Sequence, residues 1–234
     1  MSNVNMSMGV DLGKVRDPSA IVVVEAVWHR ITQGGQQVET KAYNRDRGEF
    51  AIEHYSGDSA RLEPHWHVRH ISRLELGTPY PVVVDTTIDI AQALGVYEGL
   101  VDATGVGGPV MDMYAETMRH RGRYPSRLYG IVLSGGERST PGTITKVDLV
   151  GAIQRRLSTK TVHVDPALPL AAKLVQELQD YRGRITERGN DRYGSVTESA
   201  HDDLVIAFGL ALYAARRRPT DTARVIDIRE PAAV

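Results

Sequence analysis

The sequence predicts an α/β protein built on one mixed sheet, in which an antiparallel meander is followed by parallel strands flanked by helices. Strand patterns dominate the first third of the chain, whereas helical and strand-like segments alternate after residue 80. The chain has 234 residues and is 41% hydrophobic, which is enough to bury one substantial core. We therefore expect a single domain at 1–218 and a polar tail at 219–234 that is loosely attached.

The antiparallel part is predicted from short apolar runs near the N-terminus. Strands are expected at Met8–Asp11, Ala20–Trp28 and Gln37–Ala42, and a further half-buried strand at His65–Ile71, where polar and apolar residues alternate. The polar segment Asn44–Pro64 contains two glycines and a proline, so we interpret it as a long loop or insertion. The segment His65–Ile71 contains three histidines. Because alternation places only two of them on one face, a half-buried strand is favoured over a zinc site.

The second part is predicted from alternating periodicities and from breaker residues. Helices are expected at Pro81–Leu94, Pro109–Arg121, Thr145–Leu157, Pro169–Tyr181 and Ala200–Arg217. Strands are expected between them at Gly99–Asp102, Leu128–Leu133 and Thr161–Val164. Strand–helix alternation of this kind is typical of a parallel arrangement.

Composition excludes several classes of function. The chain has no cysteine, so neither disulfides nor thiolate zinc sites are possible. No apolar run reaches the ~18 residues of a membrane span, and the N-terminal residues lack a signal-peptide pattern. The formal net charge is −1, from 28 Lys and Arg against 29 Asp and Glu. A strongly basic DNA-binding surface is not indicated, but acids and bases gathered in separate places would sum to the same total.

Four aspartates lie where secondary structure can direct them to one place. Asp11 ends the first strand, Asp102 ends a later buried strand, and Asp202 and Asp203 open the last apolar helix. Turn formation or helix capping would account for any one of them alone. Together they are the oxygen ligands that a hard divalent cation requires, so the sequence predicts a site for two metal ions acting on phosphodiesters. Asp17, in an Asp-Pro-Ser turn, is predicted to be structural.

The two adjacent acids of the last helix are not equivalent. Neighbouring helix positions point about 100° apart. Asp203 starts the apolar stripe that continues through Ala207 and Leu210, so we favour it as the primary ligand over Asp202. The neighbouring His201 is interpreted first as part of the helix cap, with metal binding or water positioning as alternatives.

Basic residues near these acids are candidates for contacts with a phosphate backbone. Lys146 opens a helix after a glycine-rich turn and could neutralise a scissile phosphate. The segment before the last helix carries Arg182, Arg184, Arg188 and Arg192 among glycines and tyrosines. We interpret it as a DNA-facing hairpin, with a solvated surface loop as the alternative.

Five motifs, in order, resemble the nuclease domain of a tailed-bacteriophage terminase large subunit. They are GVDLGKVRDPSAIVVVE, RHISRLELGTPYP, LVDATGVGGPVMD, TKVDLVGAI and HDDLVIAFGLAL, and the resemblance spans residues 6–217. It implies an RNase H-like fold of the retroviral integrase superfamily. It also implies that Asp11, Asp102, Asp202 and Asp203 bind two Mg or Mn ions that cut concatemeric double-stranded viral DNA during genome packaging.

The same resemblance implies a setting for the protein. The segment Arg182–Thr197 would be a β-hairpin beside the active site. The implied partners are a packaging ATPase domain or chain, the small terminase subunit and the portal, in the cytoplasm of an infected bacterial host, with no membrane involved. A complete terminase subunit carries a packaging ATPase, but no G-x-x-x-x-G-K-[ST] phosphate loop occurs in this chain. An excised domain, a separately encoded nuclease, or a motor on another chain are the alternatives.

Three other functions remain open from the sequence. VDLG and DATGVGG resemble the phosphate loops of actin-like or sugar-kinase ATPases, although such proteins are usually longer. A Holliday-junction resolvase shares the fold and a carboxylate-rich last helix. A catalytically silent docking domain of a packaging motor is the third alternative, and the complete set of four acids argues against it.

Overall fold

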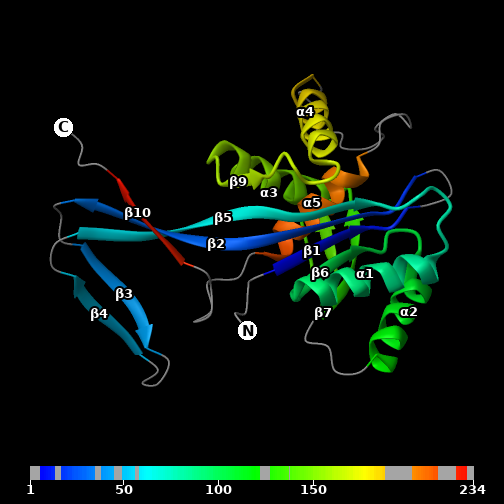
Figure 1. Ribbon diagram of the computed structural model, residues 1–234, viewed down its shortest axis with the longest axis horizontal. Helices are drawn as coiled ribbons and strands as arrows, with labels where there is room; N and C mark the ends of the chain where they lie inside the picture. Colours follow the sequence, from blue (N-terminus) through cyan, green and yellow to red (C-terminus); the bar gives the residue numbers. More distant parts are fainter. Residues whose placement is uncertain are drawn as a thin grey trace.

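A mixed sheet of eight strands forms the centre of the described protein (Figure 1). The structure is a computed structural model, and it describes residues 6–13, 17–34, 38–44, 49–55, 58–121, 127–136, 138–187, 202–215 and 225–230. The strands of this sheet are β1 (Met6–Asp11), β2 (Ala20–Gly34), β5 (Asp58–Arg73), β6 (Val96–Asp102), β7 (Arg127–Ser134), β8 (Thr143–Thr145), β9 (Val162–Val164) and β10 (Val225–Glu230).

The strand order confirms the predicted mixed sheet. The main path is β8-β7-β6-β1-β2-β5-β9, with β10 paired to β2. The strands β1, β2 and β5 are antiparallel neighbours, whereas β1, β6, β7 and β8 run parallel. The first strand therefore lies at the centre, between the antiparallel meander and the parallel half, and its C-terminal end lies beside that of β6.

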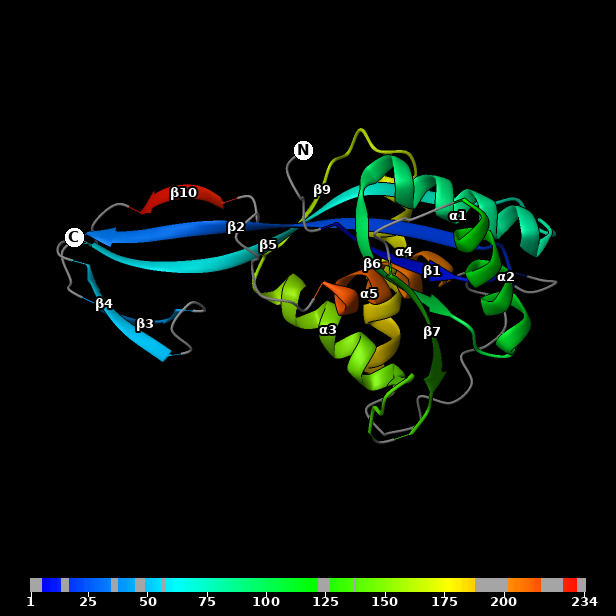
Figure 2. The same cartoon turned by 90° about the horizontal axis from the view of Figure 1, so that it is seen from below.

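Five helices in the described residues cover the two faces of the sheet (Figures 1 and 2). The helices α1 (Tyr80–Leu94) and α2 (Gly107–His120) cover one face, and α3 (Lys146–Ser158), α4 (Ala171–Glu187) and α5 (Asp203–Ala214) cover the other. Alternation along β2 serves both cores. Its Ile21 and Val23 pack with α1 and α2, and its Val22 and Val24 pack with α5.

Helix α5 is the central element of its layer. Nearly all of its residues are buried, which explains why its sequence is apolar on every side. It lies against β1 at Gly9, where an added Cβ would overlap the carbonyl oxygen of Ala207 and lie 2.5 Å from the backbone nitrogen of Ala211. Only glycine allows this approach, which brings the N-terminal end of α5 to the end of β1.

The prediction that Asn44–Pro64 is a long loop was wrong. It contains β4 (Glu49–Tyr55), which pairs with β3 (Val38–Asn44) in a separate two-stranded sheet, and the beginning of β5. Pro64, taken as a loop signal, lies inside β5 opposite Trp28. It is tolerated there because β9 pairs with β5 only from Trp66 to Val68, so none of the described strands pairs with this edge of β5 at Pro64.

The tail also differs from the prediction of a loosely attached segment. Its residues Val225–Glu230 form β10, which pairs in parallel with Trp28–Gln33 of β2. Among the described residues, no helix combines the length and the hydropathy needed to cross a bilayer.

Candidate active site

Two carboxylates meet where the central parallel strands end. In the register of β1 and β6, Asp11 is the partner of Asp102. The Asp102 carboxylate accepts a hydrogen bond from the backbone N–H of Thr104 at 2.8 Å, and the Thr104 hydroxyl accepts one from the N–H of Leu133 at 2.8 Å. The turn after β6 is thus tied to β7, which holds Asp102 at the strand end.

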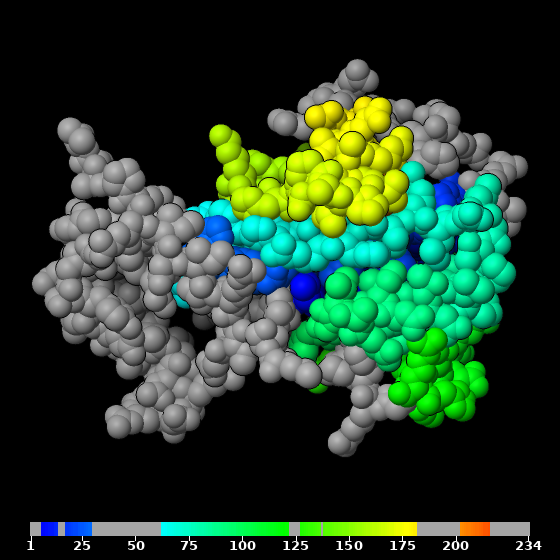
Figure 3. Space-filling view, in the orientation of Figure 1, coloured from blue at the N-terminus to red at the C-terminus, as the bar shows by residue number. Residues whose placement is uncertain are grey.

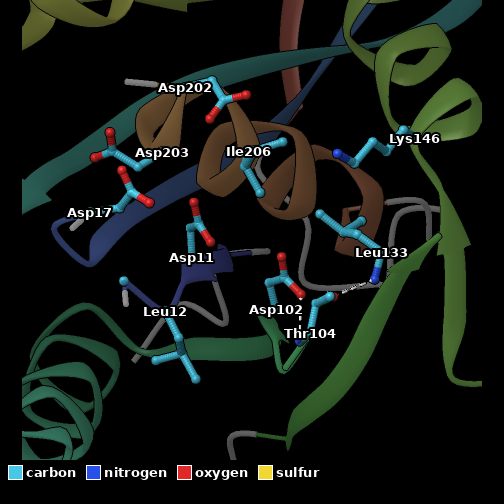
Figure 4. Close-up of a pocket in the computed structure, with 11 residues that line it drawn as sticks. Asp11, Leu12, Asp17, Asp102, Thr104, Leu133, Lys146, Asp202, Asp203 and Ile206 are labelled. Carbon is cyan, nitrogen blue, oxygen red and sulfur yellow. Dashed lines mark hydrogen bonds between the residues drawn. The ribbon is translucent and has the colours of Figure 1, made fainter. Parts of the chain in front are cut away.

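The last helix brings the other two predicted acids to the same place. All four line one cavity of about 270 Å³, in which Asp11 lies between Asp203 and Asp102 (Figure 4). Asp202 lies just before α5, and its carbonyl accepts the first helical hydrogen bond, from Ile206, at 2.8 Å. The helix therefore begins at Asp203, later than the predicted Ala200, and His201 lies outside the described residues.

The electrostatics of Asp11 reflect this gathering of charge. Burial raises the pKa of the Asp11 carboxyl well above its usual value, and the nearby charges of Asp102, Asp203, Asp202 and Asp17 raise it further. Ionising all of these groups together is therefore unfavourable without a positive counter-charge.

Asp17 is an acid that the sequence analysis did not assign to the site. It was assigned to a turn, but its side chain lines the cavity with the four predicted acids (Figure 4). A hydrogen bond from the N–H of Gly13 to the Ser19 hydroxyl, at 2.9 Å, holds the two ends of this loop together. Gly13 also lies against the Asp17 backbone, leaving no room for a side chain. In the sequence, the available indication that Asp17 could join this site was that it follows Asp11 by only six residues.

One predicted base also lines the cavity. Lys146 is the first residue of α3, where the Thr145 hydroxyl caps the helix by accepting the N–H of Asp148 at 3.0 Å. It extends towards the cavity on the side of Ile206 and Leu133 (Figure 4). A cation there faces the acids across the opening, as a phosphate-binding lysine would require.

The first residues of the predicted arginine-rich hairpin are helical in the structure. Helix α4 continues to Glu187, so Arg182 and Arg184 belong to a helix and not to a hairpin. The predicted helix end at Tyr181 was therefore too early. Arg188, Arg192 and the rest of the proposed hairpin lie outside the described residues.

Sequence reasoning also missed the partners of Asp203. Arg73, at the end of β5, donates from Nε to Asp203 Oδ2 at 2.6 Å and from Nη2 to Asp203 Oδ1 at 2.9 Å. The same Nη2 donates to Glu177 Oε1, on α4, at 2.7 Å. Since 130 residues separate Arg73 from Asp203, no local pattern could have indicated this contact.

The donor chemistry of the cavity fits a hard divalent cation. Five carboxylates line it, and oxygen ligands of this kind are those that Mg²⁺ and Mn²⁺ prefer. The unfavourable charge at Asp11 is the kind that a bound cation relieves. As they stand, no three acidic or histidine side chains in the described part of the chain are arranged to enclose a metal ion. Binding would therefore require rotation of carboxylates.

A histidine cluster lies on the sheet outside this cavity. His65 and His67 share a face of β5, as alternation predicts, and are joined there by His29 of β2 and His163 of β9. The rings of His29 and His65 stack at 3.8 Å, and a hydrogen bond of 2.7 Å links His65 Nδ1 and His163 Nε2. Burial lowers the pKa of His67 to about 4.

Comparisons with known proteins include several similar solved structures, two of which are described below. No family model matches the chain, and no curated protein matches it. The large terminase nuclease of the thermophilic phage G20c is 19% identical, covers 91% of this chain and 83% of its own, and has a TM-score of 0.46. The Holliday junction resolvase of fowlpox virus is 8% identical, covers 89% of this chain and 95% of its own, and has a TM-score of 0.36. Both similarities are distant.

Proposed function

We propose that this protein is a metal-dependent DNA endonuclease of the RNase H-like type, with its active site at the ends of β1 and β6. One observation carries the proposal: Asp11, Asp102, Asp202 and Asp203 come from three separate parts of the chain and line one cavity. Structural acids at strand ends have no reason to gather where their charges raise the pKa of Asp11.

In this proposal each residue has a distinct task. Asp11 and Asp102 would hold divalent cations from the two strand ends, and Asp203 and Asp202 would complete the ligand set from α5. Two such cations supply Lewis-acid activation of water and stabilisation of the leaving oxygen in phosphodiester hydrolysis. Lys146, on the opposite side of the cavity, would contact phosphate oxygens and hold the DNA strand over the acids.

The biological role follows from the sequence motifs. We assign the cleavage to the cutting of concatemeric double-stranded viral DNA during genome packaging, in the cytoplasm of an infected bacterium. The implied partners are a packaging ATPase domain or chain, the small terminase subunit and the portal. The resemblance in the five motifs supports this assignment, and the cavity supports the chemistry.

The test is cleavage of supercoiled plasmid by the purified protein with Mg²⁺ or Mn²⁺, with EDTA in a parallel reaction. We expect nicking and linearisation that EDTA abolishes. Asp11→Asn should be inactive, whereas Asp112→Asn, which changes an exposed aspartate of α2 outside the cavity, should cut normally. A four-way junction offered beside linear duplex separates packaging-type cleavage from junction resolution. Equal activity of the two variants would exclude the assigned site.

A further inference from the structure

Arg73 links the proposed active site to a second buried carboxylate that is not part of it. Its guanidinium binds both oxygens of Asp203 and also Oε1 of Glu177. Asp203 lines the cavity, whereas Glu177, on α4, does not. Arg73 thus contacts the cavity only through Asp203 and is not itself among the residues that line it.

The burial of these three side chains makes the contact strong and specific. The side chains of Asp203 and Glu177 are each 4% exposed, and that of Arg73 is 18% exposed. In such an environment, charge-assisted hydrogen bonds are short and a two-pronged arginine contact fixes the plane of the carboxylate. Lys173 also approaches Glu177, at 4.0 Å, so Glu177 remains paired on its own helix.

Arg73 has two consequences for the cavity. Both oxygens of Asp203 are engaged, so this carboxylate is held in one orientation relative to Asp11. The positive charge of Arg73 also offsets part of the negative charge that the acids would present to a cation. Asp203 is therefore a ligand with restricted direction and reduced charge.

We propose that Arg73 is a positioning residue for catalysis, which orients Asp203 for the reaction and weakens the hold of the acidic cavity on divalent cations. This inference rests on the proposed nuclease function. It assigns Arg73 no contact with DNA or metal, because Arg73 does not line the cavity. A purely structural tie between β5, α4 and α5 is the alternative that the experiment must separate.

The experiment measures Mn²⁺ binding by calorimetry without DNA, and the rate of plasmid cleavage at saturating Mn²⁺. Arg73→Gln removes both the positive charge and the two-pronged contact with Asp203. Arg73→Lys keeps the charge but cannot make the two-pronged contact. Arg121→Gln is the matched control, because Arg121 also binds two carboxylates, Asp85 and Asp89, but outside the cavity.

We expect Arg73→Gln to bind Mn²⁺ more tightly, by roughly three- to tenfold, since a unit charge close to the cation is removed. Arg73→Lys should keep the Mn²⁺ affinity of the wild type within about twofold, because its charge is retained. Both variants should lose cleavage rate at saturating Mn²⁺, since neither holds both oxygens of Asp203. Arg121→Gln should match the wild type in both measurements.

A structural tie alone would lower the active fraction without changing Mn²⁺ affinity, so unchanged or weaker binding by Arg73→Gln overturns the inference. If Arg73→Gln does not fold, Arg73→Gln combined with Glu177→Gln removes the repulsion between Glu177 and Asp203; it should also lose cleavage rate at saturating Mn²⁺, and a full rate would overturn the inference. If neither variant folds, Arg73→Lys tests the inference alone. A full cleavage rate in that variant excludes positioning of Asp203 by the two-pronged arginine contact. A wild type that neither binds Mn²⁺ nor cleaves DNA overturns the proposed function itself, and this inference with it.

Discussion

Asp11 and Asp102 are register partners in the parallel ladder of β1 and β6, and each is the last residue of its strand. Parallel strands place their C-terminal ends at one edge of a sheet, so two residues far apart in sequence enter one cavity (Figure 4). Removing one charge from this pair should therefore affect both chemistry and stability.

Asp11→Asn should abolish cleavage and raise the melting temperature in the absence of divalent cations. The folded pKa of Asp11 lies above its ordinary value, so ionised Asp11 disfavours the folded state at neutral pH. For a domain of this size, each stability gain of about 1 kcal/mol raises the melting temperature by roughly 2–4 °C. The gain should disappear in acid, where the native carboxyl is protonated as well. Calorimetric melts of this variant and of Asp112→Asn at two pH values check the prediction, and a lower melting temperature at neutral pH contradicts it.

Asp102→Asn should be nearly as damaging to cleavage as Asp11→Asn. Of the two acids at the start of α5, Asp203 should matter more. Asp203→Asn should reduce the maximal rate at least about 100-fold relative to the wild type, and Asp202→Asn should reduce it less. Asp203 is buried and held in one orientation, whereas Asp202 is half-buried outside the first helical turn. Single-turnover rates at saturating Mn²⁺ measure the order, and the reverse order would make Asp202 the principal ligand.

Lys146→Gln should weaken DNA binding without changing Mn²⁺ affinity measured by calorimetry. Loss of one phosphate contact lowers the slope of log affinity against log salt concentration by about one unit. Lys160→Gln, at an exposed lysine outside the cavity, is the control and should leave the slope unchanged. Identical slopes for the two variants would remove Lys146 from the DNA-binding surface.

Replacing Arg182, Arg184 and Arg188 with alanine should weaken binding equally for all DNA sequences and flatten the salt dependence. Because Arg182 and Arg184 belong to α4, their backbone positions are about 200° apart around the helix axis. The single substitutions should therefore differ, with one reducing the salt slope by about one unit and the other leaving it unchanged. A triple variant with the slope of the wild type would show that these arginines do not contact DNA.

The histidine cluster should make stability depend on pH below neutrality. Burial, and then the nearby His163, Arg69, His29 and His65, lower the pKa of His67 to about 4. Because the unfolded chain binds this proton more readily, stability is complete above the ordinary pKa of 6.5 and is lost as the pH falls from there to about 4. After allowance for solvent screening, the loss from His67 is at most about 2 kcal/mol. Urea unfolding of His67→Gln should show a flatter profile over this range than the wild type.

Much of the fold follows from local patterns. The end of β1 at Asp11 and the alternation at His65–Ile71 were predictable because each depends on neighbours along the chain. The segment Glu49–Tyr55 was missed because its glycine and proline neighbours suggested a loop. Its pairing with β3 is a tertiary preference that propensity does not encode.

Those candidate site residues that lie at strand ends or at a helix start could be predicted from the sequence. Asp11, Asp102 and the adjacent pair at the start of α5 could be placed because each lies at the end or the beginning of a regular element. Arg73 and Asp17 could not, because an arginine at a strand end and an aspartate in a turn have many ordinary roles. Their contribution depends on what the fold brings beside them, through Asp203 for Arg73 and through Asp11 for Asp17.

The close approach of α5 to β1 at Gly9 also has a consequence for biosynthesis. The cavity needs β1, which comes first among the described strands, and α5, which is synthesised after the other four described helices. A nascent chain that ends before Asp202 lacks two of the acids of the cavity, and its Gly9 lacks the helix that packs against it. Under the proposed function, cleavage therefore has to wait until α5 has been synthesised, because only then is the cavity complete.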